Sequence, residues 1–425
     1  MKLPGAPHIV YRGVELCVEQ CSLSSLAQRF GTPLFVYSLA AIEQAHQAYQ
    51  VALRGREHLI CYAMKANSNL ALLQQFVRLG CGFDIVSVGE LERVLAAGGS
   101  PSTVLFSGVG KTRAEMRRAL EAGVLCFNVE SDAELEVLSE VAQQTTATAR
   151  VSLRINPDVD PKTHPYISTG LKSNKFGIAH EHAFASYQRA AALPGIEVIG
   201  IDCHIGSQIT QIGPYLDAVD RLLDLVERVE SQGITIHHLD LGGGLGITYR
   251  DETPPSATDL VTALLQRIDA RGHSRRKILF EPGRSLVGNA GVLVSEVLYL
   301  KPGAEKNFCI VDAAMNDLLR PAMYGVWMDI RPCRLRDGAN QTFDVVGPIC
   351  ESGDWLGRDR PLNVRAGDHV AVLSAGAYSM SMASNYNSRP RAAEVMVSGG
   401  QAWLIREREQ LAALYREERL LPARV

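Results

Sequence analysis

"LICYAMKANSNLALLQQFVRLGCGFDIVS", residues 59–87, decides the fold. It begins with an apolar run over residues 59–66 and ends with another over residues 82–87. Between them, residues 70–80 carry apolar side chains at i, i+3 and i+4 and finish on a glycine, which is typical of an amphipathic helix. An apolar strand, a helix and a second apolar strand in this order predict two parallel strands joined by a helical crossover.

The same alternation continues to about residue 285. Six further apolar runs follow, each separated from the next by a longer segment: 103–108, 126–131, 150–157, 198–206, 236–244 and 277–285. Together they predict an α/β fold, a (β/α)₈ TIM barrel over residues 36–285. The alternative is a doubly wound open sheet. The count of eight strands and the lack of an early G-x-G-x-x-G turn favour the barrel.

The pattern changes after residue 285. Short β-rich runs with Gly, Pro and Asp between them predict a second, mostly antiparallel β domain, a sandwich or small barrel. We assign residues 1–35 and 286–425 to this domain, and we expect it to complete the active site. A helical pattern returns only in the tail, over residues 406–420.

Composition limits the kinds of partner. The net charge of −3 gives no electrostatic reason to expect nucleic acid or an anionic membrane surface. The N-terminus lacks the apolar stretch of a signal peptide, and no run of 18 apolar residues occurs. The nine cysteines include no C-x-x-C pair, so we expect free thiols, a reducing compartment and no structural metal. A cytoplasmic location follows.

Polar residues follow nearly every predicted strand. In a TIM barrel the chemistry lies where the strands end, so these side chains are candidates for a site. Loop starts supply some polar residues by chance, but a whole ring of them indicates a functional site. The ring consists of Lys65, Asp84, Ser107, Asn128, Glu130, Arg154, Asn156, His204, Ser207, Asp240, Glu281 and Arg284.

Lys65 ends the first strand, and its position predicts a Schiff-base lysine. An amine attacks a carbonyl only when neutral, and burial at a strand end disfavours the charged form. The alternative is a lysine whose charged end reaches water. The run Gly242, Gly243, Gly244 and Gly246 favours the first interpretation, because backbone amides there can approach a phosphate, whereas a tight turn needs only one or two glycines. A lysine together with a phosphate site suggests pyridoxal phosphate.

Nine motifs then establish a resemblance that covers nearly the whole chain, from about residue 7 to residue 422. The chain resembles the diaminopimelate decarboxylases, which belong to the alanine-racemase-like, barrel-type pyridoxal phosphate enzymes. Each motif alone is weak, but their order and combination are specific. They are "YAMKANSN", "GFDIVSVGELERVLAAG", "HPYISTGLKSNKFGI", "CHIGSQI", "LDLGGGLGI", "EPGRSLV", "DAAMNDLLRPAMYG", "VGPICESGD" and "SAGAYSMSMASNYN".

The resemblance implies a role for each matching residue. Lys65 would hold pyridoxal phosphate, His204 would stack on its ring, and Glu281 would face the pyridine nitrogen. For Glu281 the simpler alternative is a salt bridge to Arg284. The cofactor-binding residues implied are Lys65, Asp84, His204, Ser207, Gly243, Gly244, Glu281, Gly283, Arg284 and Tyr378. The substrate-binding residues implied are Arg284, Arg320, Tyr324, Glu351 and Tyr378.

Cys350 is implied to be the proton donor. In the family, the cysteine of this loop reaches the active site of the neighbouring subunit, which implies a homodimer with Cys350 and Glu351 acting in trans. The alternative is a buried, inert thiol. With Lys65 and His204, Cys350 completes the implied catalytic set.

The implied reaction is decarboxylation of meso-2,6-diaminopimelate at its D-centre, which yields L-lysine and CO₂, the last step of lysine biosynthesis. Ornithine-, arginine- or carboxynorspermidine-type decarboxylases share the scaffold. Their substrates lack the second carboxylate or hold it differently, so Arg320 with Tyr324 and Glu351 favours diaminopimelate. A racemase would need a second base, and a pyridoxal phosphate carrier would resemble the barrel alone. Residues 164–178 are a candidate lid.

Overall fold

The computed structural model describes residues 3–160, 169–170 and 174–422. The chain divides into two compact units. The barrel unit consists of Gln44–Ile247 and Glu252–Leu286, and the β unit of Met1–Glu43, Thr248–Asp251 and Val287–Val425.

Among the described residues of the barrel unit, eight parallel strands close on themselves. They are β5 (His58–Ala63), β6 (Gly82–Ile85), β7 (Val104–Phe106), β8 (Cys126–Val129), β9 (Ala149–Asn156), β11 (Ile196–Asp202), β12 (His238–Asp240) and β13 (Lys277–Phe280). The pairing of β8 with β9 and of β13 with β5 completes the ring. A short strand, β10 (Ile178–Ala179), adds to β9. The predicted TIM barrel is confirmed, and the open sheet is excluded because such a sheet has two free edges.

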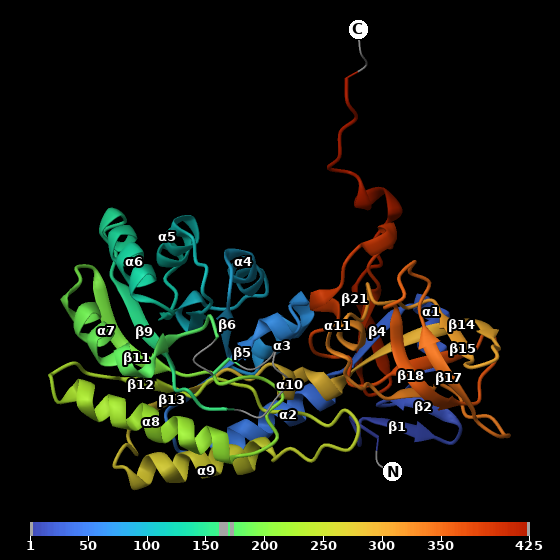
Figure 1. Ribbon diagram of the computed structural model, residues 1–425, viewed down its shortest axis with the longest axis horizontal. Coiled ribbons are helices and arrows are strands. Elements are labelled where there is room, and N and C mark those ends of the chain that lie inside the picture. The colour runs from blue at the N-terminus through green and yellow to red at the C-terminus, as the bar shows by residue number, and fades with distance from the viewer. Residues whose placement is uncertain (1–2, 161–168, 171–173, 423–425) are drawn as a thin grey trace. The chain divides into compact units, whose positions relative to one another are not determined.

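Helices follow the strands around the barrel, and α7, α8 and α9 pack side by side (Figure 1). They are α2 (Leu39–Ala52), α3 (Leu70–Arg78), α4 (Val88–Ala96), α5 (Arg113–Ala122), α6 (Asp132–Gln144), α7 (His180–Ala192), α8 (Gly213–Glu230), α9 (Ala257–Ala270) and α10 (Arg284–Val287). Local sequence fixes several of their starts. Asn69, Ser87 and Ser131 each accept a backbone N–H in the first turn, and Thr112 forms a capping box with Glu115.

The β unit is built on a sheet of nine strands among its described residues. The main path runs β18 (Trp355–Leu362), β17 (Gln341–Val346), β15 (Phe308–Val311), β14 (Gly291–Lys301), β4 (Leu34–Ser38), β20 (Ala393–Ser398) and β21 (Gln401–Arg406). Off this path, β19 (His369–Val372) pairs with β14 and with β16 (Ile330–Pro332). Most pairs are antiparallel, as predicted, but β15 with β17 and β20 with β4 are parallel.

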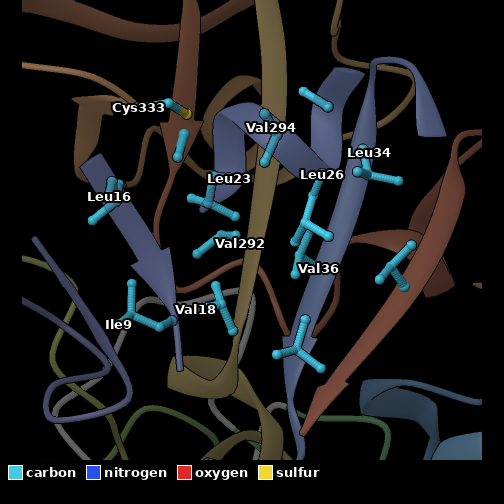
Figure 2. Close-up of a cluster of buried hydrophobic side chains, with 14 of the residues drawn as sticks. Ile9, Leu16, Val18, Leu23, Leu26, Leu34, Val36, Val292, Val294 and Cys333 are labelled. Carbon is cyan, nitrogen blue, oxygen red and sulfur yellow. The ribbon is translucent and has the colours of Figure 1, made fainter. Parts of the chain in front are cut away.

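The N-terminal segment contributes to the core of the β unit. It forms β1 (Ile9–Arg12), β2 (Glu15–Val18), β3 (Cys21–Ser22) and α1 (Leu23–Phe30). Figure 2 shows Leu16, Leu23 and Leu26 of this segment gathered with Val292 and Val294 of β14 in one buried cluster. Because the cluster joins residues from both ends of the chain, this unit forms only when the two ends come together.

Two further predictions concern the tail over residues 406–420 and the candidate lid. The helical pattern of residues 406–420 does not form an α-helix; only the 3₁₀ turn Leu411–Leu414 occurs there, and Leu420 and Leu421 are exposed. The apolar side chains of Leu411, Tyr415 and Leu420 are exposed, so helical spacing alone does not stabilise a helix there. The candidate lid at 164–178 falls partly on residues outside the described ones, so it stays a prediction. In the described part of the chain, no helix is both long and apolar enough to cross a membrane.

We predict that Gly376→Ala destabilises the β unit by about 1–3 kcal/mol, because a Cβ there would overlap the carbonyl oxygen of Val287 and lie only 3.0 Å from the amide nitrogen of Gly291. Thermal unfolding measures the effect. Gly110→Ala is the control, since a Cβ at that position meets open space. Equal unfolding temperatures for the two variants would contradict the prediction.

Candidate active site

The carboxyl ends of the barrel strands bring a ring of polar side chains together. Asp84, Asn128, Asp202 and Asp240 lie on strands and are almost completely buried, and Glu281 follows β13 and is 5% exposed. Parallel strands with closed register place these residues at one mouth of the barrel. Every sequence-predicted residue of the barrel unit belongs to this mouth.

Lys65 lies in the 3₁₀ turn Met64–Ala66 that follows β5. Its Nζ donates to Oδ2 of Asp84 over 2.7 Å, and its side chain is 35% exposed while that of Asp84 is fully buried. The sequence argument expected a buried amine. The structure instead gives a partly exposed amine paired with a buried carboxylate. Asp84 therefore holds the Lys65 side chain in place at the end of β5.

Three carboxylates lie close together inside the barrel. Oxygens of Asp202, Asp240 and Glu281 are within 4.8 Å of one another, and Asn128 Nδ2 donates to Glu281 Oε1 over 3.1 Å. Burial raises the pKa of Asp202 and of Glu281, and it raises the pKa of Asp240 to about 7. At neutral pH this cluster therefore retains protons. Carboxylates at this spacing also suit a cation, and the expected absence of a metal stays a prediction.

His204 follows β11 and is neutral. Burial lowers its pKa well below the usual value, and the charges of Arg154 and Lys65 act in the same direction. Its Nδ1 accepts the backbone N–H of Gly243 over 3.2 Å, so the proton of the neutral ring lies on Nε2. The imidazole is therefore fixed in one tautomer by the glycine loop of the neighbouring strand.

The glycine loop is required by close backbone packing. A Cβ on Gly243 would overlap the carbonyl oxygen of Glu281, and one on Gly244 would overlap that of Gly206. Gly242 and Gly244 also have positive φ values of 64° and 97°. The loops after β11, β12 and β13 thus touch through their backbones, which explains several glycines where a simple turn needs fewer.

Ser207 and Arg284 are joined directly. The Arg284 guanidinium donates to Ser207 Oγ through Nε at 3.2 Å and Nη2 at 2.9 Å. For Glu281 the structure gives a contact from Asn128, whose Nδ2 donates to Oε1, and the simpler interpretation of Glu281 as a partner of Arg284 stays a prediction. Gly283 lies against Ala63, where a Cβ would be 3.0 Å from the Ala63 carbonyl oxygen.

The predicted residues of the β unit fall in three segments. Arg320 begins the short helix α11 (Arg320–Tyr324) and is 4% exposed; its guanidinium lies 5.6 Å from the ring centre of Tyr324 and 5.2 Å from that of Tyr249. Cys350 and Glu351 lie in the exposed loop after β17, so Cys350 is not a buried thiol. Tyr378 is half-buried with a positive φ of 54°.

The sequence patterns did not identify two residues of these sites, Asp202 and Tyr249. Asp202 lies two positions before His204 in an apolar strand, and an acidic residue at that inward position was the available signal. Tyr249 follows the glycine loop and had no signal of its own, because its contact with Arg320 joins segments about 70 residues apart.

We predict that Asp240→Asn changes the pH dependence of stability. A folded-state pKa of about 7 lies above the unfolded value, so the group stabilises the protein at low pH and loses this effect as the pH rises through about 7. The variant should therefore gain stability relative to wild type more near pH 8 than near pH 5, by at most about 3 kcal/mol, because about two of the pKa units fall within that range. Thermal unfolding at both pH values measures it.

Asp344→Asn is the control of opposite sign. Burial alone would raise the pKa of Asp344, but the N–H of Asp359 and the ammonium of Lys306 outweigh burial and lower that pKa. Removing that charge should cost more stability near pH 8 than at acidic pH. Parallel behaviour of the two variants would contradict the assignment of a retained proton to the barrel cluster.

Comparison with known proteins agrees with this geometry. Residues 39–288 match the family described as pyridoxal-dependent decarboxylase, pyridoxal binding domain. A diaminopimelate decarboxylase of Pseudomonas aeruginosa is 60% identical over 412 residues, which cover 97% of this chain and 99% of that protein. One of Vibrio cholerae is 56% identical over 96% of this chain and 97% of its own length.

Solved structures give the same result. A crystal structure of diaminopimelate decarboxylase from M. jannaschii in co-complex with L-lysine has a TM-score of 0.94 at 38% identity and covers 99% of both chains. The lysine decarboxylase of Selenomonas ruminantium is less similar, with a TM-score of 0.80 at 26% identity over 88% of this chain and 95% of that one. The chain therefore belongs to the diaminopimelate decarboxylases, within the family of pyridoxal-dependent decarboxylases.

Proposed function

We propose that the protein binds pyridoxal 5'-phosphate in its barrel and decarboxylates meso-2,6-diaminopimelate at the D-centre, releasing L-lysine and CO₂. The observation that carries the proposal is the strand-end lysine beside a buried carboxylate, in a barrel that matches the pyridoxal binding domain. The high identity to diaminopimelate decarboxylases over nearly the full length supports the substrate.

The residues present fit the cofactor. An aldehyde needs an amine, which Lys65 supplies, and a phosphate needs backbone amides without side chains, which the loop of Gly243 and Gly244 supplies. A protonated ring nitrogen would favour the charged form of Glu281, which burial otherwise disfavours, and a ring face needs a flat neutral group such as His204. The glycine loop was predicted to bind the phosphate through Gly243 and Gly244. Because the N–H of Gly243 already donates to His204, we assign the remaining backbone amides of this loop to the phosphate.

Each side chain then has a task. Lys65 anchors the cofactor through its amine, and Asp84 accepts a proton when that amine must react. Ser207 and Arg284 bind beside the phosphate and the substrate. When bound, pyridoxal phosphate supplies the electron sink for the bond pair left when CO₂ departs. Cys350 donates the proton that the same carbon then takes up.

Substrate choice depends on the second carboxylate. Arg320, held against the Tyr249 and Tyr324 rings, presents a fixed guanidinium suited to that carboxylate, and Glu351 suits the distal ammonium. Ornithine and arginine lack this carboxylate. With those substrates the Arg320 guanidinium would have no distal substrate carboxylate to bind, which favours diaminopimelate over these rivals.

We propose a homodimer in which Cys350 and Glu351 act in the neighbouring subunit. The exposure of both residues supports this, since a side chain that enters another subunit's site must leave its own surface. All nine cysteines are free, which suits a reducing compartment, and we place the enzyme in the cytoplasm.

Lys65→Ala should abolish both the yellow absorbance of the bound cofactor and lysine release from meso-diaminopimelate, because no other amine replaces the anchor. Absorbance spectra and a lysine assay on purified protein measure this. Lys277→Ala, which removes a lysine on β13 paired with Glu57, is the control and should keep both properties. A yellow, active Lys65→Ala protein would contradict the proposal, and a yellow wild type that releases no lysine would redirect the substrate to ornithine, arginine or carboxynorspermidine.

Cys350→Ala and Lys65→Ala should complement each other. If Cys350 acts in trans, each heterodimer has one site with both residues, so an equal mixture dissociated and reassociated should recover about a quarter of wild-type activity. Each variant mixed with itself is the control. No recovery from mixtures shown to contain heterodimers would place Cys350 in the site of its own subunit.

A further inference from the structure

Two functional loops of the β unit leave the same edge of its sheet. Strands β15 and β17 are parallel neighbours, with Ile310 opposite Val346. The chain after β15 forms the arginine loop, residues 312–319, which leads into α11 at Arg320. The chain after β17 forms the thiol loop, residues 347–354, which carries Cys350 and Glu351. Parallel pairing thus brings the two loops together.

Asp354 joins these loops through a single carboxylate. Its Oδ1 accepts the backbone N–H of Met315 in the arginine loop over 2.6 Å, and its Oδ2 accepts the N–H of Ile349 in the thiol loop over 2.8 Å. The residue is 4% exposed. Both oxygens are therefore used, one for each loop, in charge-assisted hydrogen bonds shielded from water.

The packing around this carboxylate is tight. A Cβ on Gly347 would lie 2.5 Å from Asp354 Oδ2, 2.6 Å from Ala314 Cβ and 2.7 Å from the Ala313 carbonyl oxygen. The absence of a side chain at Gly347 thus lets the start of the thiol loop touch the arginine loop. Any larger residue there would push the two loops apart.

A third segment fixes the same two loops. The N–H of Cys350 donates to Asn387 Oδ1 over 3.0 Å, and Arg389 Nε donates to Asn316 Oδ1 over 3.1 Å. The thiol loop and the arginine loop are therefore each bound to residues 387–389 as well as to Asp354. The backbone next to the thiol is held on both sides, at Ile349 by Asp354 and at Cys350 by Asn387.

The chemistry of the contact requires a carboxylate. An asparagine offers one acceptor oxygen, so one of the two amides would face an NH₂ group and lose its partner, and an apolar residue would leave both amides unpaired. Burial raises the pKa of Asp354 and works against its charge, while the two amides favour that charge. A costly buried charge is thus kept where it connects two functional loops.

We propose that Asp354 is a positioning residue for the decarboxylation: by tying the thiol loop to the arginine loop, it sets where the Cys350 thiol delivers its proton. The inference rests on the proposed function of Cys350. Both side-chain oxygens of Asp354 bind backbone amides, and the residue is 4% exposed, so we assign it no direct role at the reacting atoms. It acts through the backbone next to Cys350 and through the loop that leads to Arg320.

Turnover of meso-diaminopimelate in D₂O tests the proposal with the holoenzyme. A well-placed thiol delivers one deuteron to one face of the carbon that loses CO₂, so lysine from the wild type carries deuterium in a single configuration. Asp354→Asn should give lysine of mixed configuration at that carbon and lower kcat/KM on the order of 100-fold. A purely structural role would reduce the amount of active enzyme without changing the configuration of the product.

Asp344→Asn is the matched control. Asp344 on β17 also has little exposure and accepts a backbone N–H, that of Asp359 over 2.9 Å, but its side chain binds Asp359 and Lys306 and connects neither loop. It should give product of a single configuration.

Gly347→Ala is the second variant. It displaces the Asp354 carboxylate without removing it, so this variant too should give lysine of mixed configuration. It also serves as the test if Asp354→Asn does not fold.

The outcomes distinguish a failure of the proposed function from a failure of the positioning role of Asp354. If wild type releases no lysine, the proposed function fails. If wild type gives one configuration and both Asp354→Asn and Gly347→Ala give that configuration too, the positioning role is overturned while the function stands. Mixed configuration in both variants but not in Asp344→Asn supports the positioning role.

Discussion

A closed parallel barrel must bring the carboxyl ends of all its strands to one mouth, and the other features of the barrel unit depend on that constraint. Closure presses the loops after β11, β12 and β13 against each other, so that Gly243 and Gly244 have no room for a side chain. The same closure forces Asp202, Asp240 and Glu281 into one buried group. The close backbone contacts and the cluster of carboxylates therefore both result from the barrel topology, and both lie in the site that we propose for the cofactor's phosphate and ring nitrogen.

The β unit differs, because the residues that we propose to be functional lie on loops and on the short helix α11 and not on strand ends. Loops are mobile unless something holds them. Here buried polar contacts do so: Arg320 rests against two tyrosine rings, and Asp354, Asn316 and Asn387 connect the loops through backbone amides and side-chain hydrogen bonds. The barrel positions its residues by topology, whereas the β unit positions them by specific hydrogen bonds.

This difference explains how far sequence reasoning reached. The barrel was predictable because a period of strand and helix repeats along the chain, and its strand-end residues could be read in order, from Lys65 to Glu281. Asp202 was missed although an acidic residue in an otherwise apolar strand was an available signal. The partly exposed setting of Lys65 could not be foreseen because it depends on Asp84, from a neighbouring strand. Tyr249 and Asp354 act through contacts between segments distant in sequence, and no local pattern encodes those. The tail over 406–420 shows the converse, since helical spacing without a packing partner gave no helix.

The exposure of Cys350 has a chemical consequence. All nine cysteines lie within the described residues, and only this one is exposed, while Cys21 is half-buried and the others are buried. Oxidants convert accessible thiolates to sulfenic acid and then to forms that are not readily reversed, and access controls the first step. If Cys350 is the proton donor that we propose, the exposure that lets it reach the reaction centre also makes it the point at which peroxide would inactivate the enzyme while the fold stays intact. Lysine supply would then fall with oxidative stress before any loss of protein.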